Sequence, residues 1–135
     1  MQIVLMAVLV LHVLTAVFWA GSTFTLARMS GERAEQFFAP QMGAAAVAAL
    51  TGLVLWRQLH SGAFGLAAQI LAAGVAAALL AAGVQGALIG GARRKIGAAS
   101  GADASALRRR MAVGERIAAS LLAVALIAMT VVRYV

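Results

Sequence analysis

Apolar residues fall in four long blocks that are separated by short polar segments. The blocks cover about residues 3–27, 40–59, 65–91 and 112–134. A helix needs roughly 20 apolar residues to cross about 30 Å of hydrocarbon, so each block is long enough for one transmembrane helix. The pattern predicts an all-α integral membrane protein, in which a four-helix bundle occupies residues 1–135 as a single domain.

Three local signals set the expected helix boundaries. Pro40 is expected in the first turn of the second helix, where its missing N–H costs nothing. Residues 60–64 form a short connection, so the second and third helices are predicted to be antiparallel neighbours. The Gly/Ala/Ser-rich stretch 96–104 is expected to be a mobile connection, and the last helix is expected to begin near Ser105.

Charge is sparse and lies mostly beside two of the connections. Only 11% of residues are charged, against 64% hydrophobic, and the net charge is +7. Nine of the 11 basic residues flank the first and third connections, while Arg57 and Arg133 lie on the other side. Short cytoplasmic loops are enriched in Lys and Arg. The bias predicts a bacterial inner (plasma) membrane protein with both termini in the periplasm, and it excludes a nucleic-acid binder. Those nine residues are Arg28, Arg33, Arg93, Arg94, Lys95, Arg108, Arg109, Arg110 and Arg116.

Two sequence features indicate contacts with the membrane and with other helices. A cluster of basic residues is expected to meet anionic lipids at the cytoplasmic face, namely Arg93, Arg94, Lys95, Arg108, Arg109 and Arg110. Small residues recur every four positions along the third block and predict close helix packing, within the chain, in a homo-oligomer or in a larger membrane complex. These small residues are Gly74, Ala78, Ala82, Gly86 and Gly90.

A polar face on the first helix carries the sharpest chemical candidate. His12, Thr15, Trp19 and Ser22 share this face, and His12 lies about 15 Å from the outer helix end. An ionisable side chain near mid-membrane is by default a functional-site hypothesis. One interpretation is a neutral imidazole that binds haem iron or copper, with Thr15, Trp19 and Thr51 around it. The other is a histidine that hydrogen-bonds a backbone carbonyl or Thr51.

Few other residues offer chemistry. Met129 is a further candidate ligand in the outer half, and His60 is a weak one because its depth differs from that of His12. Glu115 is expected to form an ion pair with Arg28 or with a basic residue of 93–95. The chain has no cysteine and no catalytic motif or paired carboxylates, so no catalytic residue is assigned and an enzyme is disfavoured.

Two short segments resemble a known family. Leu11-His12-Val13-Leu14 followed by Phe18-Trp19-Ala20-Gly21, and Leu50-Thr51-Gly52-Leu53, are similar to motifs of the CopD-like copper-resistance and related bacterial membrane proteins. Arg110-Met111 at the start of the last helix also fits, whereas Ser22 stands where the family has a second glycine. The resemblance implies a role in copper handling or haem-linked redox chemistry centred on His12.

Two functions are therefore open at the level of sequence. The first is a membrane protein that binds haem b or copper through His12. The second is an accessory subunit of a larger membrane complex without chemistry of its own. A small transporter is disfavoured, because neither a proline nor a glycine pair breaks any apolar block at mid-depth.

Overall fold

The computed structural model describes residues 1–59, 62 and 65–135, and every regular element in this part of the chain is helical. The third helical rod is continuous but has three parts, because a six-residue π-helix, η1, separates α3 from α4. A short 3-10 turn, η2, follows the last helix. The elements are α1 (Gln2–Arg28), α2 (Ala34–Leu59), α3 (Leu66–Val84), η1 (Gln85–Gly90), α4 (Gly91–Ile96), α5 (Gly101–Val131) and η2 (Val132–Tyr134).

Four of these helical stretches are long and apolar enough to cross a membrane. They run over Gln2–Arg28, Ala34–Gln58, Leu66–Ile96 and Gly101–Tyr134, with mean hydropathies between 1.6 and 2.6. A helix suits such sequences because it satisfies every backbone hydrogen bond within one segment. The expectation of an all-α chain with four helices of spanning length is confirmed for the described residues.

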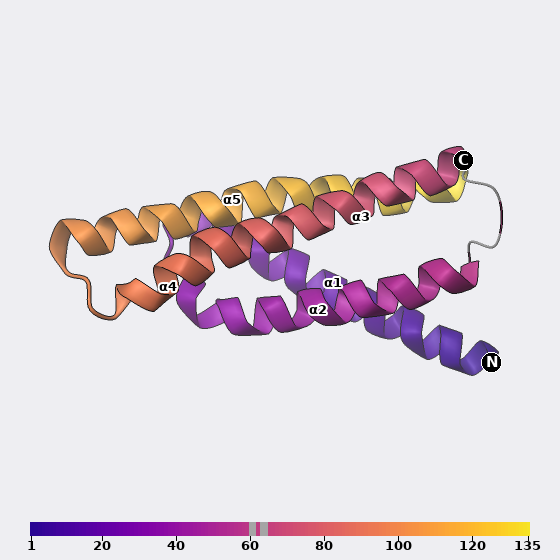
Figure 1. Cartoon of the computed structure of the whole chain (residues 1–135), viewed down its shortest axis with the longest axis horizontal. Helices are drawn as coiled ribbons and strands as arrows, with labels where there is room; N and C mark the ends of the chain where they lie inside the picture. Colours follow the sequence, from indigo (N-terminus) through magenta and orange to yellow (C-terminus); the bar gives the residue numbers. More distant parts are fainter. Residues whose placement is uncertain (60–61, 63–64) are drawn as a thin grey trace.

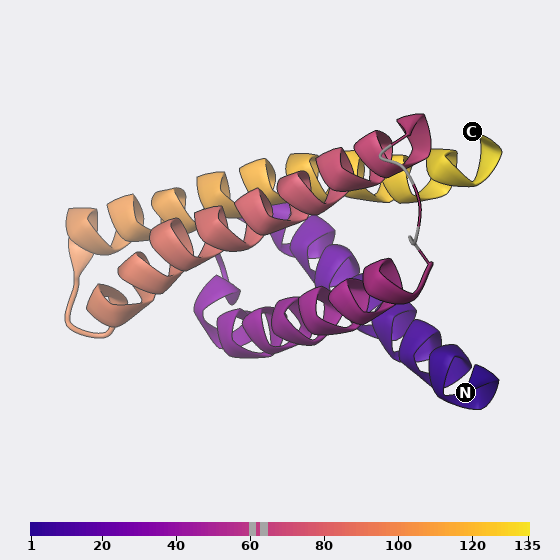
Figure 2. The same ribbon diagram turned by 45° about the vertical axis from the view of Figure 1, so that its right-hand side comes forward.

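The helices form two hairpin-like pairs that meet at one end. α1 packs along α2, and α3 packs along α5 (Figure 1). The pairs are joined where α1 contacts α5 and where α2 contacts η1. Both chain termini lie at the end opposite the α4–α5 connection, and the amino-terminal part of α1 diverges from α3 and α5 in both views (Figures 1 and 2).

Two expected helix boundaries are wrong. α2 begins at Ala34, so Pro40 lies inside the helix rather than in its first turn. Its ring nitrogen cannot donate to the carbonyl of Gln36, yet the helix continues to Leu59. α5 begins at Gly101 instead of Ser105, and only residues 97–100 of the expected mobile stretch lie outside helices.

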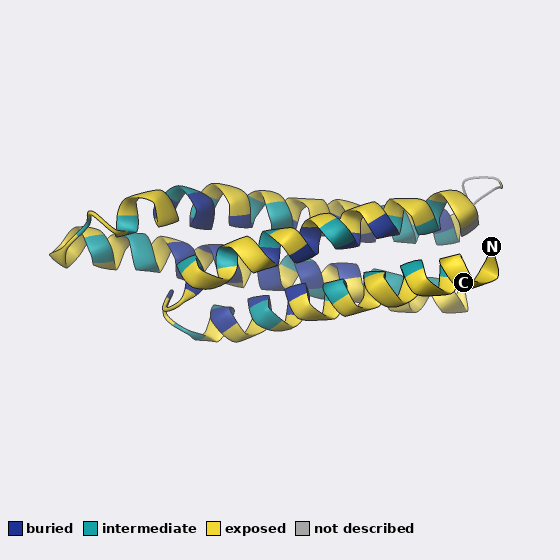
Figure 3. Ribbon diagram, turned by 90° about the horizontal axis from the view of Figure 1, so that it is seen from below, coloured by how far each residue is buried: buried dark blue, intermediate teal, exposed yellow. Residues whose placement is uncertain are grey.

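The core is narrow and built mainly from alanine. One cluster of buried residues surrounds Trp19, and a second surrounds Ile89 and Met111. Buried positions gather along the middle of the bundle, whereas the outward faces and the outer ends are largely exposed (Figure 3). Small side chains allow helix backbones to approach closely, which is how helices pack in lipid. The exposed apolar residues form the surface that hydrocarbon would cover.

The small residues of the third helix do not all serve the same contact. A Cβ on Gly74 would lie 2.9 Å from the Cβ of Ala128 on α5, and one on Gly90 would lie 2.9 Å from Cζ of Phe38 on α2. Ala78 and Ala82 are partly buried against the cluster around Trp19. Gly86 is exposed, and a Cβ there would meet nothing within 4 Å. Within this chain, the four-residue repeat therefore does not form one continuous packing surface.

Candidate functional site

His12 lies near the middle of α1 and points its ring at α2. Its Nδ1 is 2.9 Å from the carbonyl oxygen of Ala48 and 3.1 Å from Oγ1 of Thr51. A carbonyl oxygen only accepts, so Nδ1 must carry the proton and donate it to Ala48. In the neutral imidazole, Nε2 then keeps its lone pair. The ring is thus fixed in the tautomer whose free nitrogen is Nε2.

Gly52 and Thr51 are the α2 residues that lie against this imidazole through their backbone and hydroxyl group. A Cβ on Gly52 would lie 3.1 Å from Cε1 of His12, so the absence of a side chain lets the ring lie against the helix backbone. The Thr51 hydroxyl donates to the carbonyls of Val47 and Ala48 at 2.7 and 3.1 Å. Its oxygen therefore meets the His12 N–H as an acceptor. The structure brings His12 and Thr51 together, as their similar depth in the sequence predicts.

The other residues expected around His12 lie elsewhere. Thr15 donates to the carbonyls of Leu11 and His12 within α1, at 2.8 and 3.1 Å, and does not contact the imidazole through a hydrogen bond. Trp19 turns toward the third helix instead. Met129 is partly buried on α5. His60 lies outside the described residues.

The ligand set at His12 is small. In the described ranges, no group of three or more His, Cys, Asp or Glu side chains is close enough to hold a metal ion. A copper ion held by protein alone would need several such ligands or methionine thioethers around it. Haem already provides four nitrogen ligands, so it needs only one or two axial side chains.

A second polar site lies deeper in the bundle and joins all four spans. The indole N–H of Trp19 donates to Oε1 of Gln85 at 2.7 Å, and Nε2 of Gln85 donates to Oγ1 of Thr23 and Oε2 of Glu115, both at 3.0 Å. Gln41 on α2 adds a 3.1 Å bond from its Nε2 to Oγ1 of Thr23. Thr23, Gln41, Gln85 and Glu115 have exposures of 0%. We refer to Trp19, Thr23, Gln41, Gln85 and Glu115 as the buried polar cluster.

Glu115 is bonded differently from the sequence expectation. Its predicted ion pair is wrong, because its hydrogen-bond donor is the Gln85 amide and no cation lies within ion-pair distance in the part of the chain described. Oε1 of Glu115 and Oε1 of Gln41 are buried without a hydrogen-bond partner. The two side chains lie close together. The cluster thus has two unmatched acceptors at its centre.

The π-helix η1 positions the amide that organises this cluster. Gln85 is its first residue, and Gln85, Ile89 and Gly90 are its buried residues. π-Helical segments are rare and are frequent at functional sites. Thr23 and Gln41 were not singled out from the sequence. The available signal was their depth, since Thr23 lies five positions before Arg28 and Gln41 lies eight positions after Arg33.

Basic side chains at the end of the bundle that carries the α4–α5 connection make several local contacts. Arg108 forms a 3.5 Å ion pair with Glu35. Arg110 and Arg116 donate to the carbonyls of Ala87 and Ala27, both at 3.3 Å. The remaining members of the expected lipid-contacting set, Arg93, Arg94, Lys95 and Arg109, are exposed. The turn at 29–33, the end of the third helical rod and the start of α5 therefore form one basic surface.

Comparisons with known proteins complete the description of the site. No protein-family model matches the chain, and searches of curated proteins and of solved structures also give no match. The similarity to CopD-like proteins therefore rests on the two short motifs alone and stays a prediction.

Proposed function

We propose that this chain is a multi-pass protein of the bacterial plasma membrane that binds haem b through Nε2 of His12. The observation that carries the proposal is the hydrogen bond from Nδ1 of His12 to the carbonyl of Ala48, at 2.9 Å. Metal-ligating histidines usually donate their second N–H to a carbonyl or carboxylate, which fixes the tautomer and raises the basicity of the ligating nitrogen. His12 has this arrangement near the middle of a helix of spanning length.

The residues around His12 fit an axial ligand in two further respects. Thr51 accepts at 3.1 Å from the same N–H, so the ring cannot easily rotate away from α2. Gly52 leaves the Cε1 edge of the ring against backbone, where any side chain would be within 3.1 Å. When bound, haem would supply one-electron redox chemistry. The chain's own contribution is to orient the imidazole through Ala48 and Thr51.

An accessory-subunit role is the second candidate, and one face of α1 favours it. Val10, Leu14 and Val17 lie on neighbouring turns and are 56%, 62% and 62% exposed. The amino-terminal part of α1 also diverges from α3 and α5 (Figure 2). Such a face suits a helix of another subunit as well as lipid. In this interpretation, His12 only ties α1 to α2.

The test of the proposal is the composition of protein purified from its own membranes. We expect a Soret band and a haem content near one per chain, with copper well below that level. Copper at stoichiometric amounts with no Soret band would contradict the choice of haem. Absence of both would favour the accessory-subunit role.

A further inference from the structure

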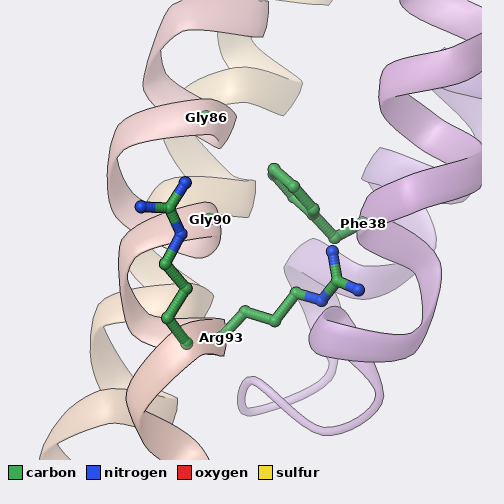
Figure 4. Close-up of a pocket in the computed structure, with 5 residues that line it drawn as sticks. Phe38, Gly86, Gly90 and Arg93 are labelled. Atoms are coloured by element: carbon green, nitrogen blue, oxygen red, sulfur yellow. The ribbon is translucent and has the colours of Figure 1, made fainter.

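A cavity of about 440 Å³ opens between α2 and the third helical rod at the basic end of the bundle. Phe38, Gly86, Gly90, Arg93 and Arg94 line it (Figure 4). The ring of Phe38 points from α2 toward the helix that carries Gly86 and Gly90. The guanidinium carbon of Arg93 lies 5.5 Å from the centroid of this ring. The cavity thus combines an aromatic wall, a glycine wall and two cations.

The two arginines have no acidic partner in the described ranges. The only ion pair there joins Arg108 to Glu35 in the first turn of α2. Arg93 and Arg94 are both exposed, so their charge is available to an external anion. A guanidinium matches a phosphate with two parallel N–H donors, and it also stacks on aromatic rings. The contact with Phe38 holds one guanidinium at the cavity, where it would meet such an anion.

The glycine wall explains why the cavity exists. A Cβ at Gly90 would lie 2.9 Å from Cζ of Phe38, so the glycine lets the ring lie against the helix backbone in this position. Nothing lies within 4 Å of a Cβ at Gly86, about one helical turn toward the apolar part of the rod. The volume falls in the usual range for ligand pockets and is far larger than one oxyanion needs. The space therefore continues from the arginines toward the apolar surface.

We propose that this cavity is a headgroup site for an anionic phospholipid. Arg93 and Arg94 bind the phosphate, and the open surface at Gly86 receives the glycerol and the upper part of an acyl chain. Basic pockets between helices at the cytoplasmic side of membrane proteins bind such headgroups. The same phosphate chemistry is present in free phosphate, but the size of the cavity and its apolar extension favour a lipid. The site is independent of His12.

The test uses the full-length protein in detergent, with native mass spectrometry of retained lipid after exposure to equal phosphatidylglycerol and phosphatidylcholine. We expect the wild type to retain phosphatidylglycerol selectively. Arg93→Gln with Arg94→Gln should reduce retention at least about tenfold more than the control pair Lys95→Gln with Arg109→Gln, which removes the same charge. Gly86→Leu should also lower retention, because it fills the cavity without changing charge or disturbing a packed neighbour.

Four results would overturn the proposal. Equal losses in the two charge-matched pairs would show diffuse attraction rather than a site. Unchanged retention in Gly86→Leu would mean that lipid does not enter the cavity. Displacement of the lipid by millimolar inorganic phosphate would assign the arginines to a free anion, and a wild type that retains neither lipid would remove the site altogether.

Discussion

The indole N–H of Trp19 and the side-chain oxygen of Gln85 are 2.7 Å apart in the middle of the bundle. Because an indole only donates, this bond fixes the orientation of the Gln85 amide. The Gln85 NH₂ group must then point at Thr23 and Glu115, which lie 3.0 Å away on α1 and α5. One bond from the first helix thus sets the directions of the bonds that join the other helices.

Replacement of Trp19 by Phe tests this role. The variant keeps an aromatic ring but loses the donor, and it frees the Gln85 amide to rotate. Interhelical hydrogen bonds in membrane proteins contribute about 0.6 kcal/mol on average and up to about 1.7 kcal/mol. We expect a loss toward the upper end of this range in the free energy of unfolding in detergent. Phe18→Leu, at an exposed position of the same helix, is the control and should change stability by less than about 0.5 kcal/mol.

Position 115 is predicted to tolerate glutamine better than leucine. In Glu115→Gln, the oxygen still accepts from Gln85, and the new NH₂ supplies a donor for the unmatched Oε1 of Gln41. We expect thermal stability equal to or above that of the wild type. Glu115→Leu removes the acceptor and should destabilise the protein by about 1 kcal/mol or more. If the Gln variant unfolds as readily as the Leu variant, the carboxylate charge itself is required and the hydrogen-bond account is wrong.

Gly74 and Gly83 form a matched pair on α3. A side chain at Gly74 would meet the Cβ of Ala128 at 2.9 Å, whereas nothing lies within 4 Å of a Cβ at Gly83. Gly74→Leu should separate α3 from α5 and cost about 1–3 kcal/mol, as overpacking usually does. Gly83→Leu should be close to neutral. Similar melting temperatures for the two variants would contradict the close α3–α5 contact.

The proposed orientation can be tested with reporter fusions. The α4–α5 connection and both termini lie at opposite ends of the bundle (Figure 1), and nine of the 11 basic residues lie beside the first and third connections. A fluorescent protein that matures only in the cytoplasm should be bright when it is fused at Ser100 and dark at the carboxyl terminus. The opposite pattern would reverse the orientation, and two bright fusions would contradict a bundle that crosses the membrane.

The sequence predicts the apolar helices well, because length and hydropathy determine whether a segment suits a bilayer. It also predicts that His12 and Thr51 lie at a similar depth in the bilayer, because this depth follows from the position of a residue along its helix. The partner of Glu115 could not be predicted in this way. Its bond to Gln85 depends on the packing of η1, and a π-helix adds a register change that leaves no mark in the hydropathy pattern. Pro40 illustrates the same limit, because α2 continues through it although the residue type favours the first turn of a helix.

The central claim is that Nε2 of His12 is an axial ligand of haem, and ligand replacement tests it most directly. His12→Gly should abolish the Soret band. The far-ultraviolet circular dichroism spectrum and the elution volume in size-exclusion chromatography should stay unchanged. Added imidazole should then restore the band, because the free molecule can occupy the space beside Gly52 and donate to the carbonyl of Ala48. A Soret band that persists in His12→Gly without imidazole, with the intensity of the wild type, would contradict the claim.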